Sequence, residues 1–276
     1  MIHRQITLTP FEDATLTSIC VTKTDRTHAR PRRAVIVCPG GAYSGLAPHE
    51  AEPIAFRFLA AGCATFVLSY SLKDKAADFA PLSEVALAIR HIREHAEEYN
   101  VDPDYIFTCG FSAGGHLAGS AGVLWNHPRV RALMADAPEG INRPTGMILC
   151  YPVISDDPVF GHRGSFRRLC GKEEPTAEES AIFSLEKQVD DTTPPAFLWH
   201  TFADKGVPVQ NSLVMAEALT RHGVPFEMHV FPEGQHGLGL CDGTYGEPSP
   251  HNACWMDLAI RWVKDFALPT KDTAEK

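Results

Sequence analysis

Short apolar runs along this chain alternate with longer segments in which apolar residues recur every three or four positions. Continuous apolar runs, typical of strands buried on both faces, stand at residues 34–38, 64–68, 106–109, 146–150, 196–200 and 226–231. Segments with helical periodicity stand at residues 48–61, 82–99, 113–124, 209–222 and 252–267. Strands that alternate with helices predict an α/β fold, in which helices cover both faces of a mostly parallel, twisted sheet.

Three segments depart from this alternation. Residues 5–8 and 15–22 alternate apolar with polar positions, which is typical of an antiparallel edge with one wet face. Residues 155–190 are polar, punctuated by Pro and Gly, and have little strand pattern. Because no repeat or linker divides the chain, we expect one domain over residues 1–276, with residues 155–190 as a cap-like insertion over the carboxyl edge of the sheet.

The composition narrows the class of protein. The chain has 276 residues, of which 44% are hydrophobic and 21% charged, so it can bury a sizeable core. Its net charge of −9 argues against a surface for nucleic acid or anionic membranes, and it fits a monomer or a small homo-oligomer. No apolar stretch is long enough for a membrane span, and residues 1–7 lack the apolar segment of a signal peptide. We therefore expect a cytoplasmic location.

The eight cysteines are scattered along the chain, and no two have C-x-x-C spacing. Three of them, Cys38, Cys109 and Cys150, end apolar runs that resemble strands. We therefore expect small buried thiols in a reducing compartment rather than a disulfide framework.

A candidate nucleophile stands between a predicted strand and a predicted helix. Residues 110–114 read Gly-Phe-Ser-Ala-Gly, the pattern G-x-S-x-G, directly after the run 106–109. A serine hydroxyl is a weak nucleophile, so it needs a sharp turn that presents it to a base and to a carbonyl group. Small residues two before and two after Ser112 relieve the crowding in such a turn. This setting favours a nucleophilic Ser112 over an ordinary turn serine.

A base and an orienting acid are expected after later strands, because reactive groups collect at the carboxyl ends of parallel strands. His236 lies on a loop rich in Gly and Pro after the run 226–231, and Asp204 lies four residues past the run 196–200. A carboxylate at Asp204 can hold the imidazole of His236 in the tautomer that accepts a proton from serine. The chain order Ser112, Asp204, His236 differs from both common protease orders.

These assignments have alternatives. Asp190 and Asp191 compete with Asp204, but both precede the strand and so stand at the opposite end of the sheet. Asp204 could also cap a helix. His200 ends a strand and is interpreted as a core or supporting residue rather than the base.

Hydrolysis by a serine nucleophile also needs N–H donors for the oxyanion of the tetrahedral intermediate, each contributing about 3–4 kcal/mol. The backbone N–H of Ala113, next to the serine, is one candidate. The others are Gly41 and Ala42, in the loop after the run 34–38, where glycines let the backbone approach a substrate.

A competing pattern suggests metal chemistry. Residues 91–95 read His-Ile-Arg-Glu-His, which matches the zinc pattern H-x-x-E-H. The surrounding helix is strongly charged, as expected of a solvated face, and the sequence offers no obvious third ligand. We therefore favour a site without metal or cofactor.

Taken together, these motifs resemble the α/β-hydrolase superfamily, and within it the esterase/lipase group that includes acetyl esterases and acetyl-xylan-type carbohydrate esterases. The resemblance runs from about Ala34 to Phe266. It is carried by Cys38-Pro39-Gly40-Gly41-Ala42-Tyr43, Glu52-Pro53-Ile54-Ala55, Gly110-Phe111-Ser112-Ala113-Gly114-Gly115-His116-Leu117-Ala118, Tyr151-Pro152-Val153, Asp204 with Val207-Pro208, and Pro232-Glu233-Gly234 before His236-Gly237.

Two departures from the group's pattern bear on the site. Related lipases have a His-Gly-Gly-Gly loop, whose first and last positions are Pro39 and Ala42 here. Ala42 keeps its N–H, so the oxyanion hole is expected to survive if φ at Ala42 is negative. The group also often has two acidic residues where Ala203 and Asp204 stand, which leaves Asp204 as the candidate acid.

The resemblance implies a serine carboxylesterase that acts on small acyl esters, above all acetyl esters of sugars. Arginines at 163, 167 and 168 could shape the leaving-group site, or they could simply face solvent. The alternatives are a peptidase or an amidase, such as an aryl formamidase, on the same scaffold, and a binding protein without catalysis.

Overall fold

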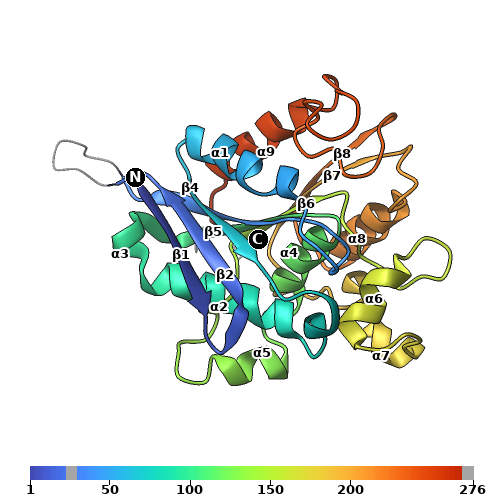
Figure 1. Cartoon of the computed structure of the whole chain (residues 1–276), viewed down its shortest axis with the longest axis horizontal. Coiled ribbons are helices and arrows are strands. Elements are labelled where there is room, and N and C mark those ends of the chain that lie inside the picture. The colour runs from blue at the N-terminus through green and yellow to red at the C-terminus, as the bar shows by residue number, and fades with distance from the viewer. Residues whose placement is uncertain (23–29, 269–276) are drawn as a thin grey trace.

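The computed structural model describes residues 1–22 and 30–268. Residues 23–29 and 269–276, which the predicted single domain includes, lie outside the described residues. Eight strands form one sheet, in the order β1-β2-β4-β3-β5-β6-β7-β8 (Figure 1). The strands are β1 (Ile2–Leu8), β2 (Phe11–Cys20), β3 (Arg32–Cys38), β4 (Ala64–Ser69), β5 (Val101–Phe111), β6 (Gly146–Cys150), β7 (Ala196–Thr201) and β8 (Phe226–Phe231).

The sheet combines an antiparallel edge with a parallel body. β1 pairs with β2, and β2 with β4, in antiparallel register, while all pairings from β4 through β8 are parallel. The chain starts the parallel body at β3, adds β4 on one side and then crosses to add β5 on the other. At such a reversal the loops after the two central strands diverge and leave a crevice. The segments after Cys38 and after Phe111 therefore start side by side at the carboxyl edge of the sheet, on either side of this reversal.

Helices cover both faces of the sheet, with α1 and α9 on one face and α2, α4 and α8 on the other (Figure 1). The helices are α1 (Glu52–Ala60), α2 (Ala80–Glu94), α3 (Ala96–Tyr99), α4 (Ala113–Val123), α5 (Pro128–Leu133), α6 (Arg163–Cys170), α7 (Ala177–Ala181), α8 (Gln210–Arg221) and α9 (Cys254–Asp265). Short 3₁₀ turns are η1 (Pro48–Glu50), η2 (Lys73–Ala76) and η3 (Leu185–Lys187).

Alternate residues of β3 enter opposite cores. Ile36 packs in the core with α2, α4 and α8, while Val35 and Val37 pack in the core with α1 and α9. All three side chains are fully buried, which explains the continuous apolar run in the sequence. The prediction of a mostly parallel sheet with helices on both faces is confirmed.

Some predicted elements differ in their bounds. The helix expected over 82–99 is interrupted at His95, and the helix expected over 48–61 begins with the separate turn η1. The sequence pattern missed α5, α6 and α7, because helices of six, eight and five residues are too short to show a helical period. Two of these, α6 and α7, lie within residues 155–190, where the structure forms no strand.

Among the described residues, no helix is long and apolar enough to cross a membrane. The cytoplasmic location and the oligomeric state stay predictions.

Candidate active site

Ser112 occupies the sharp turn between β5 and α4. Its φ of 53° and ψ of −118° are strained for a residue other than glycine. The turn leaves no room for side chains at its flanks: a Cβ on Gly110 would collide with the backbone of Gly114, and a Cβ on Gly114 with the carbonyl oxygen of Cys38. The small residues of the G-x-S-x-G pattern are therefore steric requirements of this turn.

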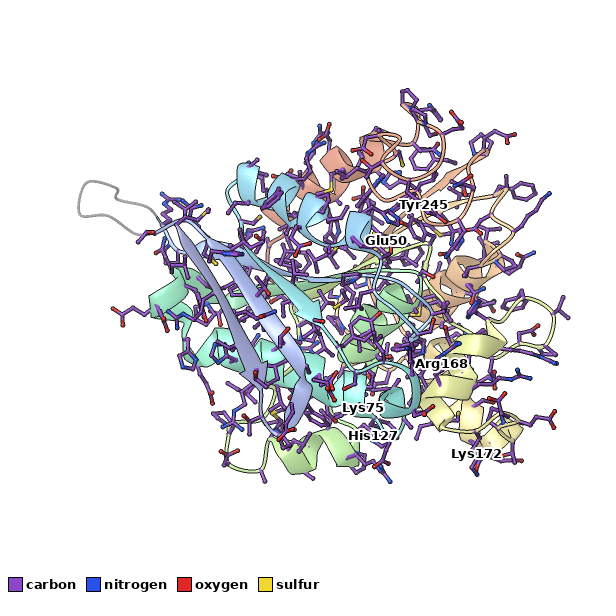
Figure 2. All side chains as sticks on the ribbon, in the orientation of Figure 1. Glu50, Lys75, His127, Arg168, Lys172 and Tyr245 are labelled. Atoms are coloured by element: carbon purple, nitrogen blue, oxygen red, sulfur yellow. The ribbon has the colours of Figure 1, made fainter. Side chains whose placement is uncertain are left out.

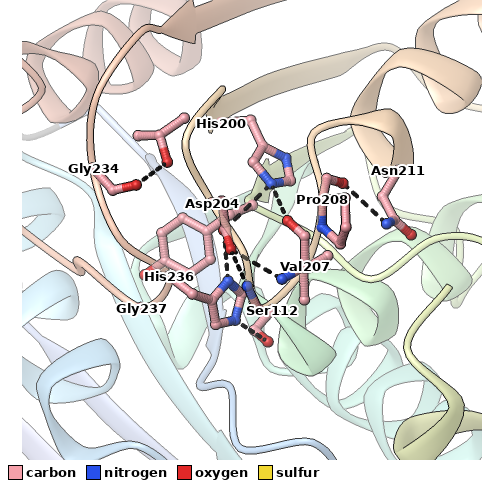
Figure 3. Close-up of polar contacts among 12 residues, drawn as sticks. Ser112, His200, Asp204, Val207, Pro208, Asn211, Gly234, His236 and Gly237 are labelled. Carbon is pink, nitrogen blue, oxygen red and sulfur yellow. Dashed lines mark hydrogen bonds and ion pairs between the residues drawn. The ribbon is translucent and has the colours of Figure 1, made fainter. Parts of the chain in front are cut away.

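The structure brings Ser112, His236 and Asp204 together from three loops (Figure 3). The Nε2 atom of His236 lies 2.8 Å from Oγ of Ser112, and its Nδ1 atom lies 2.7 Å from Oδ2 of Asp204. A carboxylate only accepts hydrogen bonds, so Nδ1 carries the proton and Nε2 is free to accept the hydroxyl proton of Ser112. This geometry matches that of a nucleophile and its general base.

Asp204 is held as an anion by a dense set of donors. Its Oδ1 atom accepts the backbone N–H groups of Gly206 at 2.8 Å and Val207 at 2.9 Å. Burial alone would raise the pKa of Asp204, but the contacts with His200 and His236 and the Val207 N–H outweigh it. The pKa of Asp204 therefore lies well below its usual range. A carboxylate that stays charged can stabilise an imidazolium beside it.

His200, Asp190 and Asp191 make no direct contact with Ser112. The Nε2–H of His200 donates to the Val207 carbonyl at 2.9 Å, and its Nδ1 accepts the Ser212 hydroxyl at 2.8 Å. His200 thus supports the loop that carries Asp204. Asp190 accepts the N–H of Thr192 ahead of β7, and Asp191 is exposed.

The loop after β3 differs from one sequence-based expectation. Ala42 has a φ of 56°, so the negative φ on which the expected oxyanion hole was made conditional is not found. The reason is a tight turn, in which the carbonyl of Gly41 accepts the N–H groups of Ser44 at 2.9 Å and Gly45 at 3.2 Å. The two central residues of this turn, Ala42 and Tyr43 (φ of 58°), take positive φ values to close it. No hydrogen bond within residues 1–22 and 30–268 occupies the N–H groups of Gly41, Ala42 or Ala113.

Sequence reasoning missed Glu50, a buried carboxylate beside this loop. Its Oε2 atom accepts the N–H of Gly40 at 2.8 Å, and its Oε1 atom accepts the hydroxyl of Tyr151 at 2.7 Å. Burial raises the pKa of Glu50 above its usual value. In the sequence, Glu50 lies in the polar first turn of the helix expected over residues 48–61, so nothing there indicates that its side chain is buried.

The arginines of residues 155–190 divide into two groups. Arg168 donates to the Ala42 carbonyl at 3.2 Å, so α6 contacts the loop after β3. Arg163 and Arg167 instead line a cavity of about 900 Å³ between α6, α7 and α8, together with Phe160 and Phe166.

The candidate zinc pattern has other partners. The rings of His91 and His95 stack with centroids 4.1 Å apart, and Nε2 of His91 lies 3.0 Å from the Tyr99 hydroxyl. Glu94 pairs with Arg90 at 2.8 Å. Within the described part of the chain, no group of three or more His, Cys, Asp or Glu side chains could hold a metal ion.

Known protein families match most of this chain. A model of the prolyl oligopeptidase family matches residues 83–244, and a model described as BD-FAE matches residues 22–143. The chain is 40% identical over 217 residues to endo-1,4-beta-xylanase B of Butyrivibrio fibrisolvens, which covers 78% of this chain and 34% of that protein. It is 30% identical over 244 residues to an acetylxylan esterase of Xylanibacter ruminicola. This match covers 87% of this chain and 47% of that protein. The chain thus spans less than half the length of these curated relatives.

A solved structure matches over nearly the whole of both chains. The acetyl ester-xyloside bifunctional hydrolase from Caldicellulosiruptor lactoaceticus superposes with a TM-score of 0.79 at 37% identity. The match covers 93% of this chain and 89% of that one. The structural match and the sequence matches therefore both include a protein named for the hydrolysis of acetyl esters.

Proposed function

Because the chain belongs to the esterase/lipase group of the α/β-hydrolase superfamily, we propose that it is a serine carboxylesterase that hydrolyses small acyl esters. The observation that carries this proposal is the pair of short hydrogen bonds that joins His236 to Ser112 and to Asp204. Each bond has the direction that proton transfer from a serine hydroxyl requires.

In the proposed reaction, the Oγ atom of Ser112 attacks the ester carbonyl carbon while Nε2 of His236 takes the hydroxyl proton. His236 then gives this proton to the leaving alkoxide, and the acyl group stays on Ser112. His236 next removes a proton from water as the water oxygen attacks the acyl carbon, and it returns this proton to Oγ of Ser112 when the Oγ–acyl bond breaks and the acid leaves. Asp204 stabilises the imidazolium that forms in both halves of the reaction.

The oxyanion of each tetrahedral intermediate needs donors near Ser112. We propose the N–H of Ala113, at the start of α4, together with the N–H groups of Gly41 and Ala42. The close approach of the two loops supports this, since a Cβ built on Gly40 would lie 3.1 Å from Cβ of Ser112.

Acetyl esters of sugars are the proposed substrates. Similarity to an acetylxylan esterase and to an acetyl ester-xyloside hydrolase supports this choice. We further propose that the chain acts as one domain, in which residues 155–190 cap the site. The bond from Arg168 to Ala42 supports a role of α6 near the leaving group.

A peptidase or amidase is the second candidate, because the prolyl oligopeptidase model matches residues 83–244. Comparing rates on acetyl, butyryl and octanoyl esters with rates on aminoacyl anilides separates the two. An esterase hydrolyses the acetyl ester faster than the anilides.

The test of the nucleophile is Ser112→Ala, assayed with 4-nitrophenyl acetate and with a fluorophosphonate label. Loss of the attacking oxygen should lower kcat by about 10⁴-fold or more and abolish labelling. Ser120→Ala is the matched control, because Ser120 lies in the same helix and donates to the backbone of His116. If Ser112→Ala keeps more than about a hundredth of the wild-type rate, the nucleophile is misassigned.

A further inference from the structure

The proposed mechanism makes no use of Glu50, although it is one of the most deeply buried charged groups of the molecule. Glu50, labelled in Figure 2, ends the turn η1 before α1. The residue is only 2% exposed. Its two carboxylate oxygens accept from two different loops, the N–H of Gly40 after β3 and the hydroxyl of Tyr151 after β6. Both loops end at the same edge of the sheet as Ser112.

Tyr151 extends this link to the loop that carries His236. Its hydroxyl oxygen also accepts the N–H of Gly239 at 2.9 Å, three residues beyond His236. Its ring packs edge-on against the imidazole of His236, with centroids 5.2 Å apart. Tyr151 has a φ of 37°, a strained value that its fully buried surroundings maintain.

His49, the neighbour of Glu50, makes a second link to the same loop. Its Nε2–H donates to the carbonyl of Gly237 at 2.9 Å, since a carbonyl only accepts. The same nitrogen lies 3.6 Å from Oε1 of Glu50. Two consecutive residues therefore contact both the loop after β3 and the loop of His236.

We propose that Glu50 is a positioning residue, which sets the spacing between the oxyanion loop at Gly40–Ala42 and the loop that carries His236. This inference rests on the proposed esterase function. A carboxylate suits the task because it only accepts, so that one oxygen is available for Gly40 and the other for Tyr151. An amide would turn a donor toward one of these two donors.

The charges around Glu50 argue against the view that it serves only to stabilise the fold. Among the described residues, the only ion-pair partner of Glu50 is the imidazole of His49 at 3.6 Å. A buried carboxylate without a close cation destabilises a fold relative to a neutral side chain of similar size. Its presence beside the site is explained if the reaction needs its geometry.

We expect substitutions of Glu50 to lower kcat rather than to raise KM. Gly40 directly precedes the candidate donors, and a Cβ built on it would lie 2.8 Å from the carbonyl oxygen of Phe111 and 3.1 Å from Cβ of Ser112. A shift of about 1 Å in such a loop can slow a reaction by about 10²-fold, and the loss of one oxyanion donor by about 10²–10³-fold. A donor aimed at the transition state contributes little to binding of the ground state.

The test compares Glu50→Gln and Glu50→Ala with wild type, using 4-nitrophenyl acetate. Competent sites are counted by the burst of acyl-enzyme, so that kcat is obtained per active site. We expect Glu50→Gln to lower kcat per site by about 10–100-fold with KM changed less than about threefold, and Glu50→Ala to lower it further. Glu52→Gln is the matched control, because Glu52 is exposed on the first turn of α1.

A purely structural role would reduce the number of competent sites and leave the rate at each one unchanged. A kcat per site within about twofold of wild type in Glu50→Gln overturns the inference. Tyr151→Phe tests the same link from its other end, and its effect should add less than fully to that of Glu50→Gln, whereas full additivity would also overturn it. Activity that survives Ser112→Ala would instead refute the esterase mechanism, so the two failures are distinguishable.

Discussion

Two buried carboxylates lie near His236, and their pKa values are shifted in opposite directions. Asp204 accepts two backbone N–H groups and the Nδ1–H of His236, and its pKa is lowered. Glu50 accepts one backbone N–H and one hydroxyl, and its pKa is raised. Both side chains are almost fully removed from solvent. Burial raises the pKa of both groups, and the difference is that the donors around Asp204 outweigh this effect whereas those around Glu50 do not.

The difference matches two different tasks. A group that stabilises an imidazolium must be charged throughout the working pH range, which requires several donors. A group that holds two loops apart needs only two acceptor atoms in fixed positions. The comparison predicts that loss of charge is the most damaging change at Asp204, and loss of acceptor geometry at Glu50.

The largest expected effect is that of Asp204→Asn. The asparagine oxygen can still accept from Gly206 and Val207, but its NH₂ group would donate to Nδ1 of His236. The proton of His236 would then move to Nε2, which could no longer accept from Ser112. We expect kcat on 4-nitrophenyl acetate to fall about 10³–10⁴-fold with the fold intact, as measured by circular dichroism.

Asp191→Asn is the control for this variant, since Asp191 is exposed just before β7. An Asp204→Asn enzyme that keeps a tenth of the wild-type kcat would remove the contrast between the two carboxylates.

Ser112, Asp204 and His236 could be predicted from the sequence for a simple reason. Each follows a strand of the parallel body, and parallel strands bring their carboxyl ends to one edge. The order of the strands therefore places the three residues near one another, even though it does not fix the distances between their side chains.

Glu50 could not be predicted in this way, because its partners Gly40 and Tyr151 come from separate loops, and Tyr151 in turn contacts Gly239 in a third. No short-range pattern marks such a link. The positive φ of Ala42 could not be predicted for a related reason, since the closure of the turn onto Ser44 and Gly45 decides it. The short helices α5–α7 were missed because they are stabilised by tertiary contacts and show no recurring apolar face in the sequence.

A second expected effect is opposite pH dependence of stability. The lowered pKa of Asp204 adds stability above about pH 4, which is lost as pH falls toward its folded pKa. The raised pKa of Glu50 adds stability below about pH 4.5, which is lost as pH rises through its folded pKa. Urea unfolding of wild type, Asp204→Asn and Glu50→Gln from pH 3 to 7 measures both.

Between pH 6 and 3, the advantage of wild type over Asp204→Asn should shrink by about 1 kcal/mol. The free energy of unfolding of wild type relative to that of Glu50→Gln should instead fall as pH rises above about 4.5. Differences of the same sign for both variants would contradict the assignment of one carboxylate to charge and the other to geometry.

The smallest expected effect tests whether the histidine beside Glu50 shares its task. His49→Phe keeps an aromatic ring, which can retain the stack on Tyr245, whose centroid lies 4.5 Å from that of His49. It removes the N–H that donates to the Gly237 carbonyl. One neutral hydrogen bond contributes about 1 kcal/mol, and water can partly replace it because the side chain of His49 is only partly buried. We therefore expect kcat to fall about three- to fivefold. Tyr245→Phe, which keeps the ring on the other side of the stack, should leave kcat unchanged. If His49→Phe slows turnover as much as Glu50→Gln does, the imidazole and the carboxylate act as one unit, and the spacing of the two loops depends on the pair rather than on Glu50.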